Sequence, residues 1–538
     1  MNLVAKTEKI TDLPDKNTAN IVLKPEVPMS IVHTSPDAAK KYFEAAQALK
    51  KEIFETKTDV KISGTAYYVS NDGNDENDGL SPETAWRSIE KLNSFEFKEG
   101  DGVLFRRGDR FKAALIPDMR SSIITRSGVT YSTYGEGAKP ILDCTVDASG
   151  EDKWKKTEWE NVWECTDKLS GVDADIGVVI FDGGRAWGIK VSVNPGKQTR
   201  MFIGKTFNGI NKNDAPEEPW ILPYNVKRDL EFHHNWDNET VYIYSEENPG
   251  KRFNTIEFAV RRHFFWGDAH DVLIDNLDIY GAGGHGVSTA HCARFTVQNS
   301  IFRWIGGSIQ SKSLPTDGRD PVRFGNSVEN WQEGKDFTIH HCYSSQVYDC
   351  CWTIQWCGIS NGEGDVRFEN VEFHHNYTEY ANNGLEVWLG PAAGNDPELQ
   401  YEINDLYLHD NYTLYAGYGW SHQRPNKDAN FFYGGLPKHT RTKFNRCNIC
   451  NNVNLYTTCY VTWASQVGPN QFNFHDNIYF MEDNKRFGLV PIDRVSCEGD
   501  QDWVLLSDEA LEKLQSDGIE QGSVFNLVPE GSVPTDFN

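Results

Sequence analysis

Apolar and polar residues alternate most regularly in the second half of the chain. Short alternating runs such as Phe337–Ile339 are each followed by a segment that opens with Asp, Asn or His and has an apolar or aromatic third residue. Alternation with a period of two predicts β-strands, and Asn suits a tight corner because it tolerates left-handed backbone. Six segments fit this description: Asp275–Tyr280, Asn299–Trp304, His341–Gln346, His375–Tyr380, Asp410–Tyr415 and Asn451–Tyr456.

These segments recur at intervals of 24, 42, 34, 35 and 41 residues. Repeats of this length are typical of solenoids, in which each repeat forms one coil that stacks on the next. The apolar third position would face the interior, and amide side chains at the corners would hydrogen-bond from coil to coil. The pattern therefore predicts an all-β fold, a right-handed parallel β-helix, with side loops in the longer intervals.

The rest of the chain indicates the domain organisation. We expect an N-terminal segment over residues 1–64, followed by the β-helix over residues 65–480. The repeats are least regular at about 145–255, which predicts an inserted β-rich module. Residues 481–538 are expected to form a C-terminal cap and tail.

Helices are predicted outside the repeats. Ser35 and Pro36 are typical of a helix N-terminus, and apolar residues then recur at helical spacing from Tyr42 to Ile53. A short helix ahead of a solenoid often covers its exposed first edge, so we expect that position here. Further helices are expected from Ser81 to about Leu92 and from Ser507 to Gln515.

Composition and charge narrow the class of partner. The formal net charge of −25 argues against nucleic acids and anionic membranes. The N-terminus has no apolar core of a secretory signal, and no apolar run is long enough to span a bilayer, which predicts a cytoplasmic protein. The 11 cysteines lack zinc-ligand spacing and are expected to be reduced core residues. The oligomeric state is left open.

The candidate chemistry comes from side chains that would face outward on one wall of the solenoid. An inward Val328 places Glu329 outward, and an inward Leu385 does the same for Glu386. Counting from His341 and His375, Asp349 aligns with Asn383, and Trp352 aligns with Glu386. Carboxylates and tryptophans are therefore expected to gather on this wall.

Such a wall has what hydrolysis of a glycosidic bond requires. One carboxylic acid protonates the leaving oxygen, and a second carboxylate attacks the sugar or activates water. Aromatic faces hold sugar rings. The candidate catalytic residues are Glu329, Asp349 and Glu386, and the candidate substrate-binding residues are His285, Trp304, Arg323, Trp331, Trp352, Gln355 and Trp388. No metal ligand is assigned.

Each candidate also has a structural interpretation. A lone outward Glu is usually a solvated surface residue, and the tryptophans could pack beneath side loops. His285 could be a hydrogen-bonded structural histidine. Arg323 could orient a carboxylate with two hydrogen bonds, or it could anchor a loop through a salt bridge.

Particular motifs add a resemblance to known enzymes. The stretch Tyr68–Trp86 is similar to the start of many pectate-lyase-like solenoids. Three further stretches, Ile301–Gly307, Arg323–Trp331 and Val347–Asp349, resemble the β-helix glycoside hydrolases of family 141, whose activities include fucosidase and xylanase. The resemblance covers residues 65–480 and implies a glycoside hydrolase of carbohydrate metabolism or polysaccharide degradation. It departs from the family at Ser327, where Gly is expected, and at the bulky Cys350-Cys-Trp run, so the substrate does not carry over.

The acidic loop before Pro82 offers a candidate cation site. Asp72, Asp75 and Asp78 have spacing suited to calcium, but no bidentate Glu follows at the twelfth loop position. A solvated turn is therefore favoured. No cofactor is required, and calcium stays an allowed ligand.

Other functions on the same scaffold stay open. A polysaccharide lyase needs a cation or Arg to neutralise a uronate, and the wall shows no basic cluster. A non-catalytic carbohydrate-binding or tailspike-like solenoid, and a sugar epimerase or intramolecular transferase, are further alternatives.

Overall fold

The computed structural model describes most of residues 28–534. The internal segments outside the described residues are 58–59, 115–120, 170–174, 195–198, 203–225, 236–237, 310–322, 357–365, 390–399, 425–428, 436–440, 465–466, 485, 490–503, 506–513 and 515.

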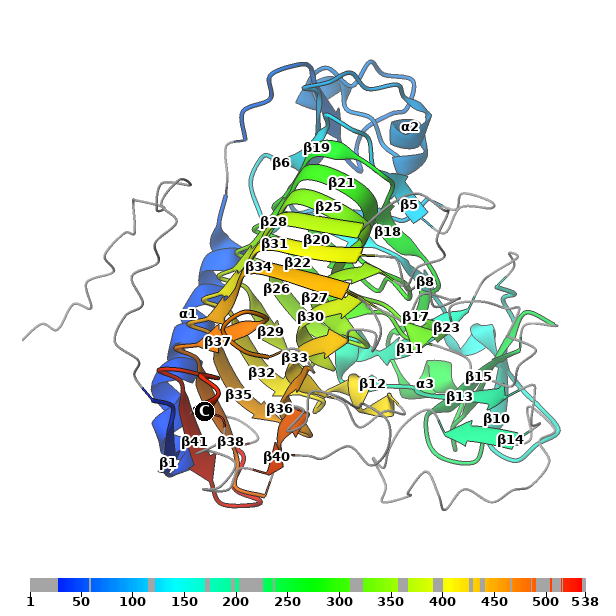
Figure 1. Cartoon of the computed structure of the whole chain (residues 1–538). Helices are drawn as coiled ribbons and strands as arrows, with labels where there is room; N and C mark the ends of the chain where they lie inside the picture. Colours follow the sequence, from blue (N-terminus) through cyan, green and yellow to red (C-terminus); the bar gives the residue numbers. More distant parts are fainter. Residues whose placement is uncertain are drawn as a thin grey trace, which may run out of the picture.

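The chain folds as the predicted right-handed parallel β-helix, and Figure 1 shows its strands stacked in coils. One face is an 11-stranded sheet whose strands pair in parallel. The core strands of this sheet are β20 (Asp278–Tyr280), β22 (Ile301–Ile305), β26 (Tyr343–Val347), β29 (Tyr377–Glu379), β32 (Tyr412–Ala416), β35 (Val453–Thr457) and β38 (Ile478–Glu482). Its edges are formed by β7 (Ile141–Asp143) and β4 (Arg110–Lys112) at one end, and by β41 (Val524–Val528) and β1 (Ser30–His33) at the other.

An 18-stranded sheet forms the other two faces. Its long strands β21 (Val287–Gln298) and β25 (Val328–His340) pair along both halves, so each contributes to two faces. The second face consists of the first halves of β21 and β25 with β5 (Ser121–Ile124), β18 (His263–Trp266), β27 (Cys350–Trp356), β30 (Asn383–Leu389), β33 (Asn430–Gly435), β36 (Tyr460–Ala464) and β39 (Arg486–Leu489).

The third face lies beyond a second corner. It consists of the second halves of β21 and β25 with β6 (Thr130–Tyr134), β19 (His270–Asp275), β28 (Val366–His374), β31 (Gln400–His409), β34 (Arg441–Cys450) and β37 (Asn473–His475). The remaining strands of this sheet are β2 (Ala66–Val69), β3 (Gly102–Arg106) and β40 (Val504–Leu505).

The predicted corners are confirmed for most coils. His341, His375, Asp410 and Asn451 all have φ between 51° and 55°. The residue after each corner points inward, and Asn376, Asn411, Asn452 and Asn477 hydrogen-bond to one another from coil to coil at 3.0–3.1 Å. This buried ladder satisfies amides that would otherwise be costly inside the solenoid.

One of the six segments was aligned one residue out of place. Asn276, and not Asp275, occupies the corner, because Asp275 pairs with Gln298 and Asp278 pairs with Ile301. The interval to Asn299 is therefore 23 residues. Leu277 takes the inward position that Ser300 occupies in the next coil, and both are fully buried.

The inserted module is confirmed and extends slightly beyond the predicted range. It contains two sheets, most of whose pairings are antiparallel. One has β8 (Thr145–Asp147), β11 (Ile176–Phe181), β12 (Ala186–Trp187) and β17 (Ile256–Val260); the other has β9 (Trp154–Lys156), β10 (Val162–Cys165), β13 (Ile189–Asn194), β14 (Thr199–Phe202), β15 (Glu231–Asn235) and β16 (Thr240–Tyr244). The short helix α3 (Pro249–Arg252) precedes β17.

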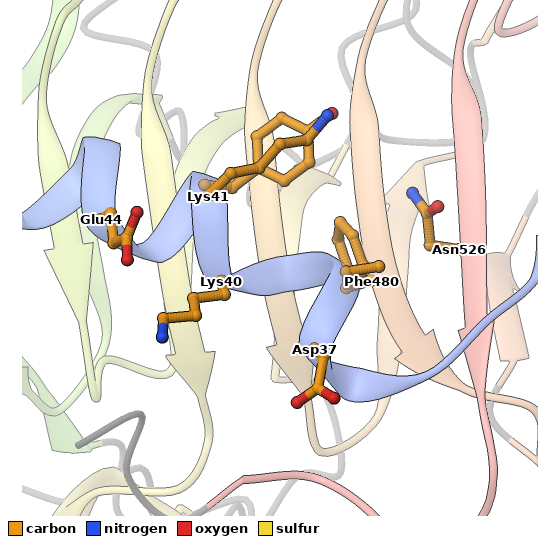
Figure 2. A pocket seen from close by; sticks show the side chains of 8 residues that line it. Asp37, Lys40, Lys41, Glu44, Phe480 and Asn526 are labelled. Atoms are coloured by element: carbon orange, nitrogen blue, oxygen red, sulfur yellow. The ribbon is translucent and has the colours of Figure 1, made fainter.

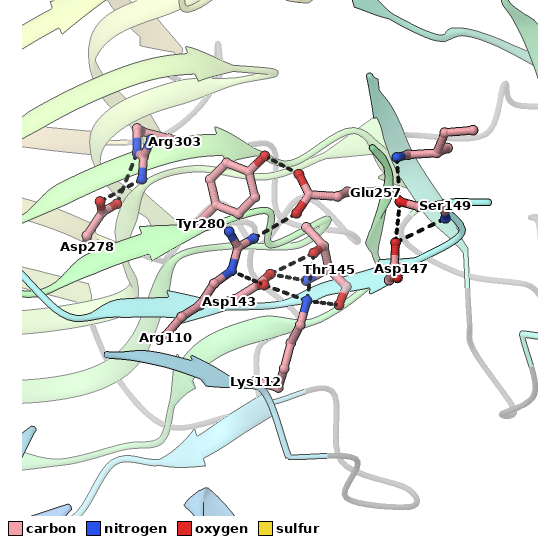
Figure 3. Close-up of polar contacts among 11 residues, drawn as sticks. Arg110, Lys112, Asp143, Thr145, Asp147, Ser149, Glu257, Asp278, Tyr280 and Arg303 are labelled. Atoms are coloured by element: carbon pink, nitrogen blue, oxygen red, sulfur yellow. Dashed lines mark hydrogen bonds and ion pairs between the residues drawn. The ribbon is translucent and has the colours of Figure 1, made fainter. Parts of the chain in front are cut away.

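Charged side chains fasten the module to the first coils (Figure 3). Arg110 of β4 bonds to the buried Asp143 at 2.6 Å and to Glu257 of β17 at 2.7 Å. The Tyr280 hydroxyl donates to Glu257 at 2.7 Å, and Arg110 and Arg303 both lie over the Tyr280 ring. The module is therefore held to the solenoid by a network rather than by a single contact.

The N-terminal helix forms as predicted but lies elsewhere. Helix α1 (Lys40–Glu55) follows a short 3-10 turn (Pro36–Ala39) and runs along the 11-stranded sheet (Figure 1). Phe54 packs edge-on against Tyr343 at 5.2 Å, and Tyr42 packs against Phe480 at 5.6 Å. The expectation that α1 covers the first edge is wrong. No helix among the described residues has the length and apolar character needed to cross a bilayer.

The predicted second helix is split in two. A 3-10 turn (Pro82–Thr84) with a capping box at Ser81 is followed by α2 (Ile89–Ser94). Figure 1 places α2 at the end of the solenoid where the first coils lie. Trp86, between the two pieces, stacks on Tyr67 with ring centroids 5.0 Å apart.

The solenoid continues past the predicted boundary at residue 480. Strand β41 pairs in parallel with β38, so it belongs to the 11-stranded sheet rather than to a separate cap. The helix predicted for Ser507–Gln515 lies outside the described residues except for Leu514.

Candidate functional site

The second face carries a row of polar side chains in register. Ser288 pairs with Glu329, Glu329 with Thr353, and Thr353 with Glu386 along β21, β25, β27 and β30. Glu329 and Glu386 are each 4% exposed. The wall predicted from alternation therefore exists, and both glutamates lie on it.

The predicted alignment of the coil that contains β27 with the next coil was wrong by one residue. Trp352 pairs with Leu385, and Cys350 pairs with Asn383, so Thr353 and not Trp352 stands beside Glu386. Tyr343 pairs with Tyr377, 34 positions on, whereas Cys350 pairs with a residue 33 positions on. The bend between β26 and β27 is thus one residue longer than the bend that follows β29.

This shift changes the role of Trp352. Its side chain is 1% exposed and packs in the core, edge-on to Phe302 at 5.7 Å. The interpretation of Trp352 as a substrate-binding residue is therefore wrong. The packing interpretation of this tryptophan holds instead.

Glu329 lies in a dense set of hydrogen bonds. Ser288 Oγ donates to its Oε1 at 2.8 Å, Asn326 Nδ2 donates to its Oε2 at 3.0 Å, and His285 Nε2 lies 3.0 Å from Oε1. Burial raises the pKa of Glu329 to about 7, the two hydrogen bonds oppose this rise, and the charge of Asp349 adds to it. His285 thus contacts a candidate catalytic carboxyl.

Glu386 has a different environment. Thr353 Oγ1 donates to its Oε2 at 2.9 Å, and Gln355 Nε2 donates to the same oxygen. Burial and then the charge of Asp349 raise the pKa of Glu386 to about 8, and the two hydrogen bonds and the Arg424 charge oppose the rise. Its Oε1 accepts no hydrogen bond from a described residue, which leaves that oxygen available to a ligand.

Asp349 occupies the bend between β26 and β27 and forms an ion pair with Arg424. Arg424 follows a 3-10 turn (Trp420–Gln423) that reaches back to the same bend, since Trp420 Nε1 donates to the Gln346 carbonyl at 2.8 Å. The guanidinium stabilises a negative charge on Asp349. The three predicted carboxylates therefore interact electrostatically, because the charge of Asp349 raises the pKa of both Glu329 and Glu386.

Trp331 and Trp388 lie beside this row. They follow Glu329 and Glu386 by two positions, and Gln355 pairs with both of them. Their ring centroids are 6.5 Å apart, and both side chains are half-buried. The pair offers an apolar surface next to the carboxyl groups.

Trp304 and Arg323 do not lie on this wall. Trp304 is 6% exposed and packs between Trp187 of the module and Trp420, which argues against the predicted substrate contact. Arg323 donates to the carbonyls of Gly307 and Gly177, at 2.6 Å and 3.1 Å. Arg323 therefore anchors the backbone and does not orient a carboxylate. The arginine that pairs with a candidate carboxylate is Arg424, which contacts Asp349.

Four residues of the site were not predicted: Ser288, Asn326, Thr353 and Arg424. Ser288 and Thr353 are outward positions of the same row, so a correct register would have found them. Asn326 precedes β25, within a motif already quoted. The sequence gives no indication that Arg424 belongs to the site, because it reaches Asp349 from a side loop 75 positions along the chain.

The acidic loop near the N-terminus forms local hydrogen bonds. Asp75 accepts from the backbone of Arg87 and Ser88 at 2.8 Å and 2.9 Å, and Asp78 accepts from the Thr84 hydroxyl at 2.7 Å. Asp72 pairs with Arg106 at 2.7 Å. These contacts agree with the turn interpretation, and calcium binding stays a prediction.

A separate surface pocket lies beside α1 (Figure 2). Its lining comes from the N-terminal helices and from β38 and β41: Asp37, Ala38, Lys40, Lys41, Tyr42, Glu44, Phe480 and Asn526. None of the candidate catalytic or substrate-binding residues lines it.

No protein-family model matches the chain. Over 441 residues it is 33% identical to a lacto-N-biosidase of Bifidobacterium longum subsp. longum, an alignment that covers 74% of this chain and 25% of that protein. The chain thus spans a quarter of the length of the curated relative it matches.

Solved structures give weaker similarities. They include a glycoside hydrolase (9% identity, TM-score 0.39, covering 88% of this chain and 98% of the other). A family 136 lacto-N-biosidase from Eubacterium ramulus has 11% identity and a TM-score of 0.33, covering 92% of this chain and 70% of that one. A complex of XylC with xylose has 12% identity and a TM-score of 0.38, covering 87% and 86%. Scores this low carry no argument, so the fold rests on the strand pairing itself.

Proposed function

We propose that this chain is a glycoside hydrolase that cleaves glycosidic bonds in oligo- or polysaccharides at the wall formed by β25, β27 and β30. The observation that carries the proposal is the pair of buried glutamates, whose pKa values of about 7 and about 8 are both raised by burial and by Asp349. A protonated carboxyl near neutral pH beside a charged one is the arrangement that general acid catalysis on a glycosidic oxygen requires.

Two further observations support this assignment. Trp331 and Trp388 offer flat apolar surface beside the carboxyls, which suits the faces of sugar rings. The local likeness to a lacto-N-biosidase points to the same reaction class. Glu386 is the better candidate for the acid because its Oε1 is available, and the charged partner is Glu329 or Asp349. Membership of family 141 stays a prediction.

Incubation of the full chain with aryl glycosides and oligosaccharides, including the substrates of lacto-N-biosidase, tests the proposal. Release of reducing sugar is expected, and Glu386→Gln should lower kcat on unactivated substrates by roughly 10²–10⁴-fold. Glu369→Gln is the matched control, because Glu369 lies on the third face and pairs with Lys335 at the surface. An unsaturated, ultraviolet-absorbing product would indicate a lyase instead, and no product with any glycoside would refute the proposal.

A further inference from the structure

Asn326 connects three parts of the site through hydrogen bonds whose directions are fixed. Its side-chain oxygen accepts from the Cys350 backbone N–H at 3.0 Å, so its amide nitrogen must be the atom that donates to Glu329 Oε2 at 3.0 Å. Its own backbone N–H donates to His285 Nδ1 at 2.9 Å. Asn326 is 1% exposed, so solvent does not compete for these bonds.

The backbone bond from Asn326 selects the tautomer of His285. Because Nδ1 accepts a hydrogen bond, the single proton of the neutral ring resides on Nε2, which lies 3.0 Å from Glu329 Oε1. The ring stacks on His263 with centroids 4.8 Å apart, and His263 Nδ1 accepts from the His285 backbone. Burial and then the neighbouring His263 hold the pKa of His285 well below its usual range, so the ring stays neutral.

Glu329 consequently faces donors on both oxygens. The His285 Nε2–H and the Ser288 hydroxyl donate to Oε1, and the Asn326 amide donates to Oε2. The neutral His285 Nε2–H and the Asn326 amide nitrogen can only donate, and the Ser288 hydroxyl is free to donate as well, so the set matches an ionised carboxylate, which only accepts. Of the groups that face it, Asp349 opposes this charge. Glu386 does not have donors on both oxygens, because Thr353 and Gln355 both donate to its Oε2.

We propose that Asn326 and His285 are positioning residues that hold Glu329 as the charged carboxylate of the reacting pair and leave Glu386 as the proton donor. This inference rests on the proposed glycoside hydrolysis. Glu386 gives its proton to the glycosidic oxygen as the bond from that oxygen to the anomeric carbon breaks. Glu329 takes a proton from the water whose oxygen bonds to the same carbon. The two carboxyls thereby exchange protonation states, and solvent restores them.

The tautomer can be measured without any activity. In the full chain carrying ¹⁵N-labelled histidine, the His285 signals are those lost in His285→Gln. A protonated Nε2 and an unprotonated Nδ1 are expected from about pH 6 to about pH 9. A proton on Nδ1, or an imidazolium, would overturn the inference. Asn326→Ala keeps the backbone N–H that donates to Nδ1, so this tautomer should be unchanged in that variant.

A second variant separates positioning from folding. Asn326→Asp keeps an acceptor for Cys350 but turns a carboxylate oxygen toward Glu329. It should move the acid limb of the kcat/KM profile to higher pH by about one unit and leave the alkaline limb in place. A uniform loss of kcat with both limbs unmoved would show a merely structural role and overturn the inference.

The roles of the two glutamates are separated with 2,4-dinitrophenyl glycosides, whose leaving group needs no proton. Glu386→Ala should still turn these substrates over. Glu329→Ala should not, because no base deprotonates the water, and azide should restore turnover because it attacks the anomeric carbon directly, forming a glycosyl azide as dinitrophenolate leaves. The reverse pattern would overturn the assignment. If the wild-type chain hydrolysed no glycoside, the proposed function would fail, while the histidine spectra would still decide whether Asn326 sets the tautomer of His285.

Discussion

Glu329 and Glu386 occupy the same row of the second face two coils apart, with Thr353 between them. Neighbouring coils are about 4.8 Å apart, so the two backbone positions are separated by roughly 9.6 Å. We infer from this backbone spacing that the carboxyl groups form the wide arrangement of about 6.5–9.5 Å, in which a water molecule fits between one carboxyl and the sugar. The narrow arrangement of about 5–5.5 Å would place the two glutamates on adjacent coils.

The wide spacing predicts inversion at the anomeric carbon. Proton NMR of the first product formed, recorded before the sugar mutarotates, should show the anomer opposite to that of the substrate. A product with the original configuration would contradict the two-coil pair and would favour direct attack by a nearer carboxylate.

The pKa values predict a narrow optimum near neutral pH. Glu329 must be charged, which requires a pH above its pKa of about 7, and Glu386 must be protonated, which requires a pH below its pKa of about 8. The kcat/KM profile should therefore be bell-shaped with its maximum between these values. An optimum near pH 5 would be inconsistent with these protonation states.

Arg424 should tune the alkaline limb of that profile. Its charge opposes the rise in the pKa of Glu386, so Arg424→Ala should move the limb to higher pH by roughly 0.5 unit. Arg446→Ala is the matched control, since Arg446 pairs with Asp405 on the third face, away from the row. If the alkaline limb did not move in Arg424→Ala, Arg424 would have no effect on the pKa of Glu386, and the prediction would be wrong.

An exposed tryptophan extends the same row. Trp266 pairs with Ser288, the neighbour of Glu329, and is 44% exposed. Trp266→Ala should raise KM for long oligosaccharides roughly tenfold, equal to about 1.4 kcal/mol, without affecting short aryl glycosides. Tyr407→Ala, 37% exposed on the third face, should change neither. Equal losses with long and short substrates would contradict a distant sugar contact.

The asparagine ladder should dominate local stability. Asn411→Ala removes buried bonds to Asn376 and Asn452 and leaves their partners unsatisfied, at a cost of about 1–3 kcal/mol. Asn445→Ala removes one exposed contact with Asn404 and should cost less than about 0.5 kcal/mol. Denaturant unfolding followed by circular dichroism compares the two. Equal effects would mean that burial of the ladder contributes nothing.

Much of this architecture could be predicted because it depends on periodic positions. The segments that begin at Asp410 and Asn451 identified the corners, and the inward Val328 and Leu385 placed Glu329 and Glu386 on one wall. The bend at Asp349 could not be predicted, because bends have no period and one extra residue there shifts every partner that follows. The position of α1 could not be predicted for a related reason. The apolar face of a helix indicates that the helix packs against another surface, but it does not indicate which surface.

The pairing of β1 with β41 has a consequence for synthesis. Ser30 pairs with Val524, 494 positions later. At about 5–20 residues per second, the first strand would wait roughly 25–100 s for its partner to leave the ribosome. Docking of that strand is therefore a late, non-local event, and the coils must persist meanwhile with one edge uncovered. A nascent chain that stalled before residue 524 would keep this edge open to pairing with other chains.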